Sequence, residues 1–336
     1  METLTNKYAI GTHVMFYEIE MLPEHVTSII TASKQISNPE NIIVDLFFNM
    51  SEFFEKIDTS KISKEELINK FKIELNRLAD SGVSVRHTIY TADNPYTMTN
   101  FRRDFNYGYC NLVDYLIWGE TDCLLPRETF ISLEQIKNYA NSQNIHRFIT
   151  TFATRKMWDD SWKVLEHVDF ENKQFYDRDN PLCYTEKYSI RYVMNQEEMD
   201  EINSKSAELD VRVLTQPKFD GSCLIISSDL IKMGVNIPPG FFGLSAEDTA
   251  FMYSCMQLLG KSYIQFVVKN ILKVHNREHT KKRLYALNMN DTNESTQRVK
   301  GDWYNKLRDI NKQNLNLFIG PRQDKFLTYE DFLKTL

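Results

Sequence analysis

The feature that most constrains the fold is an apolar run that ends in two carboxylates one residue apart. Residues 115–118 read Tyr-Leu-Ile-Trp, and Gly119 separates them from Glu120, Thr121 and Asp122. A short apolar run bounded by turn formers is typical of a buried strand in a covered sheet. Side chains two apart point to the same side, so Glu120 and Asp122 can converge on one hard cation. A polar loop that happens to be acidic is the alternative, because acid-x-acid triplets are common.

The segments on either side of this run alternate between strand and helix patterns. Strands are expected over 8–17, 41–49, 83–90 and 148–154, and helices over 18–30, 99–113 and 127–139. A long amphipathic helical insertion is expected over 52–80. Strand and helix in alternation predict an α/β domain with a mostly parallel sheet, whose ligands bind at the carboxyl ends of the strands.

A second pair of acids, Glu247 and Asp248, stands at the start of a predicted helix. The apolar stripe of that helix consists of Phe251, Met252, Cys255, Leu258 and Leu259. A carboxylate placed there could be a general base, although two acids at a helix start are also good partners for the helix dipole. The pair lies about 125 residues beyond the acid-x-acid run and follows two glycines, Gly234 and Gly243. This order of motifs along the chain favours a catalytic role for the pair over a role in capping the helix.

Aromatic and basic side chains offer further candidates. Trp158 and Trp162 lie four residues apart and suit a platform for a sugar ring or a base, although plain core tryptophan is more frequent. Arg102 and Arg103 fall on the first turns of the helix expected over 99–113. An arginine fork can pair two phosphate oxygens there, but it is equally often a surface cation.

Composition narrows the class of protein. A net charge of -6 argues against a surface built wholly for nucleic acid, although a local basic patch stays open. The five cysteines contain no Cys-x-x-Cys pair, which predicts reduced thiols rather than a disulfide framework or a structural zinc site. Residues 1–7 lack the regions of a signal peptide, and no apolar run approaches the ~20 residues that span a bilayer. We therefore expect a cytoplasmic protein without an integral membrane segment.

Residues 102–126 resemble the central block of GT-A glycosyltransferases, especially those of the family-2 type. In that block an Arg-Asn-x-Gly helix precedes an apolar strand, Asp-x-Asp and a Leu-Pro step. Residues 106–108 stand for Asn-x-Gly and residues 120–122 for Asp-x-Asp. Glu120 replaces the first Asp, which keeps a carboxylate but lengthens its reach by one methylene. A second likeness covers residues 216–253, where a small-residue strand and a helix ending in Gly lead to the Glu-Asp pair.

The resemblance implies a GT-A fold, a Rossmann-like α/β/α sandwich with a mostly parallel central sheet and a helical C-terminal extension. It also implies a division of the chain. Residues 1–126 would form the half that binds the nucleotide-sugar donor. Residues 127–290 would form the acceptor-binding and catalytic half of the same domain, and residues 291–336 the helical extension.

The resemblance further implies roles for individual residues. Asp122, Glu120 and His275 would hold Mn²⁺ or Mg²⁺, with His279 as the reserve ligand. Asp248 would be the catalytic base, supported by Glu247. The residues expected to bind the donor nucleotide are Thr12, Tyr17, Glu18, Asp45, Arg103, Asn106, Glu120 and Thr121. At two of these positions an alternative stays open, because Asn49 could replace Asp45 and Tyr17 could be the last core residue of its strand.

The implied function is metal-dependent transfer of a hexosyl or pentosyl group from a nucleoside-diphosphate sugar to an acceptor hydroxyl, with inversion. The acceptor is expected to be a saccharide or glycan, with Trp158 and Trp162 on the acceptor side. A hydroxymethylated pyrimidine in DNA, as modified by some viral enzymes, is an alternative because residues 269–283 are basic and Lys156 lies beside the tryptophans. A nucleotidyltransferase is a further alternative, although the first strand carries no Gly-rich, Lys-bearing loop. A binding module that catalyses no reaction is the last alternative.

Overall fold

The computed structural model describes residues 1–155, 159–173, 185–189, 191–214, 216–243, 246–260, 263–287, 302–319 and 327–335. Its central element is an eight-stranded sheet with the strand order β3-β2-β1-β4-β8-β6-β9-β7. The strands of this sheet are β1 (Tyr8–Met15), β2 (Ile42–Asn49), β3 (Ser84–Tyr90), β4 (Tyr115–Gly119), β6 (Phe148–Ala153), β7 (Val211–Val213), β8 (Cys223–Ser227) and β9 (Ile264–Leu272). A separate two-stranded sheet pairs β5 (Cys123–Leu124) with β10 (Val274–His275).

Four neighbouring pairs of the main sheet are parallel and three are antiparallel. The parallel pairs are β3-β2, β2-β1, β1-β4 and β6-β9. The antiparallel pairs all involve β8 or β7, since β8 lies between β4 and β6 and β7 lies outside β9. The sheet is therefore mostly parallel, and the strands from β3 to β4 all end at one edge.

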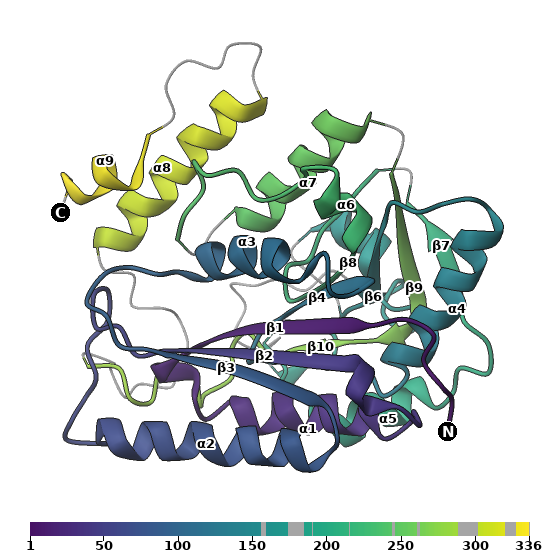
Figure 1. Ribbon diagram of the computed structural model, residues 1–336, viewed down its shortest axis with the longest axis horizontal. Coiled ribbons are helices and arrows are strands. Elements are labelled where there is room, and N and C mark those ends of the chain that lie inside the picture. The colour runs from purple at the N-terminus through teal and green to yellow at the C-terminus, as the bar shows by residue number, and fades with distance from the viewer. Residues whose placement is uncertain are drawn as a thin grey trace.

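Helices cover both faces of the sheet (Figure 1). The helices are α1 (Leu22–Ser33), α2 (Lys64–Asp80), α3 (Met98–Tyr109), α4 (Thr129–Ser142), α5 (Gln196–Asn203), α6 (Ser228–Lys232), α7 (Glu247–Leu259), α8 (Asp302–Ile319) and α9 (Tyr329–Leu333). In Figure 1, α1 and α2 lie along one face, and α3, α6 and α7 lie along the other. The fold class predicted from the sequence, an α/β sandwich with a helical C-terminal extension, is confirmed.

Each face of the sheet has its own apolar core. The α1 and α2 side buries residues such as Ile10, Leu46 and Phe71. The other side packs Trp118 of β4 against Phe251 of α7, with the ring centroids 5.1 Å apart. Trp118 is fully buried. The apolar run of β4 is thus buried on both faces, which is the reason that it reads as a continuous apolar segment.

The predicted elements agree with the observed ones apart from their ends. The strand expected over 8–17 stops at Met15, and a short 3-10 helix over Phe16–Glu18 turns the chain toward α1. The insertion expected to be helical over 52–80 becomes helical at Lys64, where Ser63 and Glu66 form a capping box. Residues 52–63, which precede this helix, are not helical and contain a turn over 59–61.

A small apolar cluster attaches the C-terminal helices to the domain. Phe242, Leu307, Ile310 and Phe332 form its centre. Asn311 of α8 binds both backbone groups of Phe242, accepting from its N–H and donating to its carbonyl. The C-terminal pair of helices therefore packs against the loop that leads to α7.

No helix in the described part of the chain is long and apolar enough to cross a bilayer. The four cysteines in that part, Cys110, Cys123, Cys223 and Cys255, are all buried free thiols. Cys183 lies outside the described residues.

Candidate active site

The two carboxylates of the acid-x-acid run lie at the carboxyl end of β4, as predicted. Gly119 ends the strand where nothing larger fits, because a Cβ there would lie 2.3 Å from the Thr12 hydroxyl and 3.2 Å from His25 Nε2. The chain then turns, and the N–H of Cys123 donates to the Glu120 carbonyl over 2.9 Å. This tight turn holds Glu120 and Asp122 at the edge of the sheet, where open α/β folds bind ligands.

His275 reaches the same place through the small second sheet. In the pairing of β5 with β10, His275 is opposite Cys123, the residue after Asp122. The N–H of Asn276 donates to the Asp122 carbonyl over 2.7 Å. As a result His275 Nε2 lies 3.2 Å from Glu120 Oε2 and 3.5 Å from Asp122 Oδ2.

The three side chains fit a divalent cation. Glu120, Asp122 and His275 each offer a ligand atom, and these atoms lie within 4.8 Å of one another. Two carboxylate oxygens and one imidazole nitrogen suit Mn²⁺ and are compatible with Mg²⁺. The predicted reserve ligand, His279, is not in this trio, and its Nδ1 instead accepts a hydrogen bond from the N–H of Lys281.

Cations already surround the carboxylates of the trio. Lys282 binds Asp122 and lies 3.5 Å from Glu18 Oε1. Burial alone would raise the pKa of Asp122, but Lys282 and His275 hold it well below its usual range. The pKa of Glu120 is lowered to about 2, since His275 and Arg102 outweigh burial. Both carboxylates are therefore ionised at neutral pH and ready to bind a cation.

The second acid pair opens α7, as predicted. The helix follows Ala246, whose φ of +66° turns the chain into it. Glu247 is buried and Asp248 is partly exposed. Burial and the neighbouring Asp248 raise the pKa of Glu247 to about 7. Burial also raises the pKa of Asp248, against the N–H of Thr249 and the charge of Arg102.

A further acid near the site, Asp220, belongs to a buried ion pair. Its carboxylate lies 2.6 Å from Nζ of Lys273, which also binds the Ser222 hydroxyl. Lys273 is fully buried. Burial by itself raises the pKa of Asp220, but Lys273 and His275 lower it far below the usual range. A carboxylate held in this way is a weak base.

Of the residues expected to bind the donor, four lie beside the trio. The Thr121 hydroxyl donates to Glu18 Oε2 over 3.1 Å, and Thr12 is buried beneath the turn, bound to His25. Tyr17 is 4% exposed and lies under the guanidinium of Arg283, 4.7 Å from its ring centroid. Its ring is therefore packed in the core and is not exposed for stacking. Tyr17 and Glu18 still line a small cavity that includes Glu120, Asp122 and Lys282.

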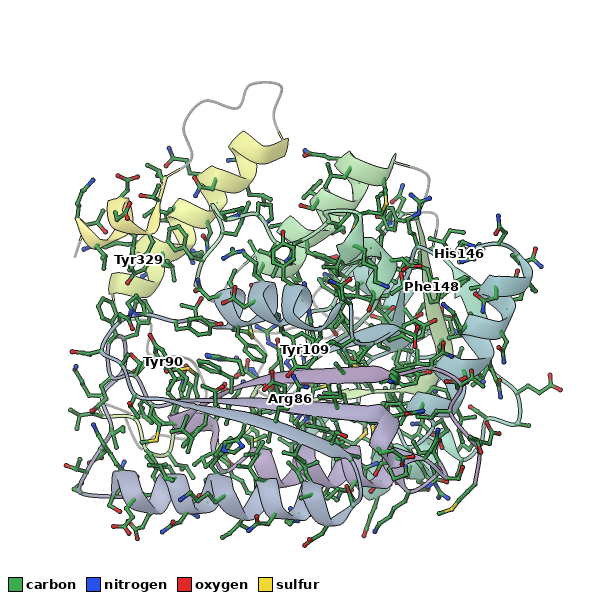
Figure 2. The ribbon with its side chains drawn as sticks, viewed as in Figure 1. Arg86, Tyr90, Tyr109, His146, Phe148 and Tyr329 are labelled. Carbon is green, nitrogen blue, oxygen red and sulfur yellow. The ribbon has the colours of Figure 1, made fainter. Side chains whose placement is uncertain are left out.

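A second small cavity continues from the first past His13 and Tyr17 to the end of β2. Asn49 lies there, and its amide donates to His13 Nε2 over 3.1 Å and to the Tyr96 carbonyl. Asp45 lies in the middle of β2, where it accepts a hydrogen bond from the Tyr109 hydroxyl over 2.8 Å. The guanidinium carbon of Arg86 lies 5.4 Å from the ring centroid of that tyrosine, and both residues are labelled in Figure 2. The structure thus brings Asn49, and not Asp45, to the edge that holds the carboxylates.

Arg103 and Asn106 serve the packing of α3. Arg103 donates to the carbonyls of Ile237, Pro238 and Phe241. Asn106 is buried between Trp118, whose indole N–H it accepts over 2.9 Å, and the amide oxygen of Asn236 at 2.8 Å. Neither side chain reaches the trio, whereas Arg102 does.

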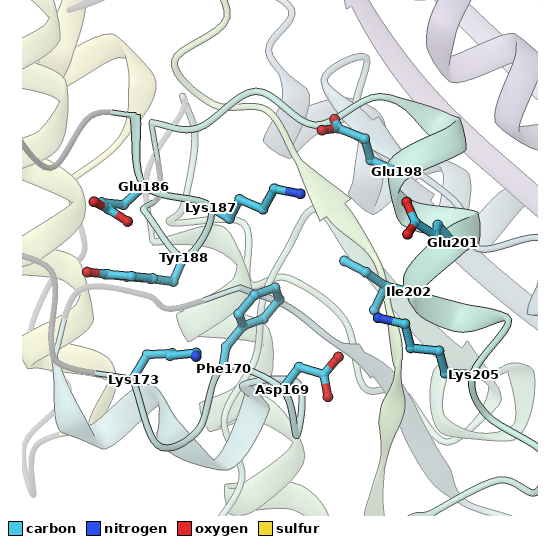
Figure 3. Close-up of a pocket in the computed structure, with 10 residues that line it drawn as sticks. All are labelled: Asp169, Phe170, Lys173, Glu186, Lys187, Tyr188, Glu198, Glu201, Ile202 and Lys205. Carbon is cyan, nitrogen blue, oxygen red and sulfur yellow. The ribbon is translucent and has the colours of Figure 1, made fainter.

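The side expected to bind the acceptor is only partly described. Trp158 lies outside the described residues. Trp162 is half-buried, and Nζ of Lys218 lies 4.4 Å from its ring centroid, so one face of the platform is covered by a cation. A cavity of about 620 Å³ lies in the insertion after β6 and is lined mostly by charged side chains, among them Asp169 and Lys205 (Figure 3).

Backbone contacts join that insertion to the trio. Arg155 donates to the carbonyls of Tyr192 and His275. Asn276, next to His275, exchanges two hydrogen bonds with the backbone of Met194, at 3.1 and 2.9 Å. The insertion is thus held against the strand that carries His275.

Two cations at the centre of the site were not assigned a role in it from the sequence. The sequence predicts Arg102 as a phosphate ligand or a surface cation, and Lys282 as part of a basic stretch. The spacing of Arg102 and Asn106, one helical turn apart, could have indicated that both face the same buried surface. No local pattern identifies Lys282, because its partners Glu18 and Asp122 come from distant parts of the chain.

No family model matches the chain, and no curated protein matches it by sequence. Among solved structures, it is similar to S. aureus TarS, with 11% identity and a TM-score of 0.36, over 78% of this chain and 60% of that one.

Two further solved structures have similar values. M. tuberculosis glucosyl-3-phosphoglycerate synthase shows 9% identity and a TM-score of 0.38 over 80% of this chain and 71% of that one. A UDP-glucose pyrophosphorylase complexed with UDP-glucose shows 8% identity and a TM-score of 0.33, over 78% of this chain and 90% of that one. The chain spans 60% of the length of the TarS structure.

Proposed function

We propose that this protein is a metal-dependent glycosyltransferase that uses a nucleoside-diphosphate sugar. The observation that carries the proposal is the arrangement of two acid pairs about Arg102. Glu120 and Asp122 lie with His275 in a trio fit for a divalent ion, and Glu247, next to Asp248, is bound through Arg102 to Glu120. The acids of the trio are suited to hold a metal ion that binds the diphosphate of the donor. The acids of α7 are suited to accept a proton from the acceptor.

The residues of the chain supply the following chemistry. Asp248 takes the proton of the acceptor hydroxyl, which is too weak an acid to attack unaided. The acceptor oxygen then forms a bond to the anomeric carbon as the bond to the diphosphate breaks, so the configuration inverts. Glu247 cannot share this task equally, because one of its carboxylate oxygens is held by Arg102. Its neighbour Asp248 is the more exposed of the two.

Glu120, Asp122 and His275 would hold Mn²⁺ or Mg²⁺. A bound ion of this kind neutralises charge that builds on a departing diphosphate. Lys282 lies beside Asp122 at the same cavity, and its ammonium group can donate a hydrogen bond to a phosphate oxygen. The donor half would therefore extend over residues 1–126, with His275 and Lys282 contributed from the second half.

A saccharide is the acceptor that we favour over DNA. The DNA alternative depends on Lys156, which lies outside the described residues, and on the basic stretch over 269–283. In that stretch Lys269, Lys273 and Arg283 are buried and form ion pairs with Glu171, Asp220 and Glu55. Buried cations cannot release counterions from a phosphate backbone. Retention on DNA at low salt, with an affinity that falls steeply as salt is added, would restore the DNA alternative.

The test is incubation of the full chain with a panel of nucleotide sugars and Mn²⁺. A glycosyltransferase should hydrolyse its own donor slowly in the absence of acceptor, releasing free sugar and nucleoside diphosphate. A nucleotidyltransferase would instead release pyrophosphate from a nucleoside triphosphate and a sugar phosphate. A binding module would do neither. No turnover of any donor, by a protein that binds one, would refute the proposal.

A further inference from the structure

The guanidinium of Arg102 lies at the centre of the site and is buried, at 1% exposure. It extends from α3 and stacks over the Trp118 indole at 4.8 Å. Its Nη1 donates to Glu247 Oε1 over 2.8 Å, and its Nη2 donates to Glu120 Oε1 over 2.8 Å and to the Gly221 carbonyl over 2.7 Å. One cation thus binds three loops that are far apart in the sequence.

The two carboxylate oxygens of Glu120 have different partners, Arg102 and His275. Its Oε1 accepts from Arg102, while its Oε2 lies 3.2 Å from His275 Nε2 and faces the trio. An aspartate at this position would be one methylene shorter. The longer side chain lets a single carboxylate bridge Arg102 and the metal-binding trio, which accounts for a glutamate where the resemblance leads one to expect aspartate.

The space around the guanidinium is closed on the remaining side by Gly221. A Cβ at Gly221 would lie 3.0 Å from Arg102 Nη1 and 3.4 Å from Asp248 Oδ2. A glycine at this position therefore leaves room for the guanidinium of Arg102 beside the Asp248 carboxylate. Any change in charge at Glu247 must be felt at Glu120, because both share one buried cation.

We infer that Arg102 is a positioning residue that couples the metal-binding trio to the acids of α7. The inference rests on the proposed function and goes beyond it. While Glu247 is ionised, it offsets part of the charge of Arg102. When the charge of Glu247 is removed, Arg102 pairs more strongly with Glu120 and repels a divalent cation at the trio. Metal binding and the state of the α7 acids therefore depend on each other, as any linkage between two sites requires.

The experiment is a double-mutant cycle with Mn²⁺ binding as the readout, measured by calorimetry on the full chain without donor. At pH 8 Glu247 is largely ionised, since its pKa is about 7. We expect Glu247→Gln to weaken Mn²⁺ binding about fivefold or more. In an Arg102→Met background the same change should alter the Mn²⁺ affinity less than about twofold, because the connection is missing.

Three further variants keep the test decisive. Asp248→Asn removes one charge from the same helix start, but this charge is not hydrogen-bonded to Arg102 as that of Glu247 is, so the change should weaken Mn²⁺ binding much less than Glu247→Gln. Arg102→Lys preserves a buried cation if Arg102→Met does not fold, and a single ammonium cannot reproduce the forked contact. Glu74→Gln, which removes a buried partner of Arg77 on α2, is the control and should leave the affinity unchanged.

The outcomes separate this inference from the proposed function. Equal effects of Glu247→Gln and Asp248→Asn, or an undiminished effect of Glu247→Gln without Arg102, would overturn the coupling while leaving the metal site intact. A wild-type chain that binds no Mn²⁺ at millimolar concentration would overturn both.

Discussion

At the scale of single residues, Asp248 and Glu247 have different surroundings although they are neighbours. Glu247 is buried and bound to Arg102, and Asp248 is partly exposed. We predict that Asp248→Asn keeps the shape of the side chain and removes its basicity. Transfer should then slow at least ~100-fold, while donor binding changes little. Steady-state kinetics together with donor titration would check this, and normal turnover by the variant would exclude Asp248 as the base.

The buried pair of Asp220 and Lys273 allows a prediction about stability. Asp220→Asn leaves Lys273 buried without its carboxylate, which should lower the free energy of unfolding by about 3–5 kcal/mol. The double change with Lys273→Met should recover much of that loss. Because the pKa of Asp220 is depressed in the folded state, its contribution is present above the unfolded pKa and is lost as pH falls in strong acid. Denaturant unfolding at pH 7 measures the first effect, and a variant as stable as the parent would refute it.

For the residues of the site, the sequence predicts the position in the fold better than the contacts that each side chain makes. The spacing of Glu120 and Asp122 after an apolar run was enough to place both at the end of a strand. Whether Asp45 or Asn49 reaches the same edge could not be decided, since this depends on where β2 ends relative to β1. The partners of Arg102 were also unpredictable, because Glu120, Gly221 and Glu247 meet only through the antiparallel insertion of β8.

At the scale of elements, the loop before α7 is fixed by α8. A Cβ at Gly243, whose φ is +95°, would overlap Leu307 of α8, and the carbonyl of Gly243 accepts from the Thr99 hydroxyl over 2.7 Å. Leu307 is 1% exposed. The C-terminal extension, for which the sequence indicated only helix, therefore supports the loop that leads to the acids.

We predict that Leu307→Ala leaves a cavity at this contact and lowers the stability of the docked α8 by about 2–4 kcal/mol. Hydrogen exchange should then speed up in α8 and in residues 240–243, while α1 and α2 keep their protection. The matched control is Leu333→Ala, at an exposed position of α9. Unchanged exchange in residues 240–243 would show that α8 does not hold the loop.

The elements themselves were predictable because their patterns are strong. The strands from β1 to β4 and the helices between them appear at the expected places. Their ends were less predictable, since caps such as Ser63 at α2 compete with the apolar pattern. The pairing of β5 with β10 was not foreseen, because two residues on each side carry no periodicity.

At the scale of the whole molecule, metal binding should stabilise the folded chain, because the trio exists only after distant segments meet. An ion at 100 times its Kd adds about 2.7 kcal/mol to the free energy of unfolding. We predict that Mn²⁺ raises the melting temperature and that EDTA reverses the rise and abolishes transfer. Asp122→Asn should reduce the rise more than Glu120→Gln, because Asp122 keeps the residue type of the Asp-x-Asp motif and Glu120 does not. Full activity in excess EDTA would contradict this.

The position of β8 has a consequence for how such an enzyme changes over time. Between β6 and β8 the chain makes a long excursion that rejoins the sheet at the edge strand β7, and β6 and β8 are direct neighbours, with Thr151 opposite Leu224. A long excursion with adjacent ends can be lengthened or exchanged without shifting the register of the strands that hold Glu120 and Asp122. Under the proposed function, selection can therefore alter the acceptor by changing one segment, while the strands that hold the proposed metal site are inherited intact.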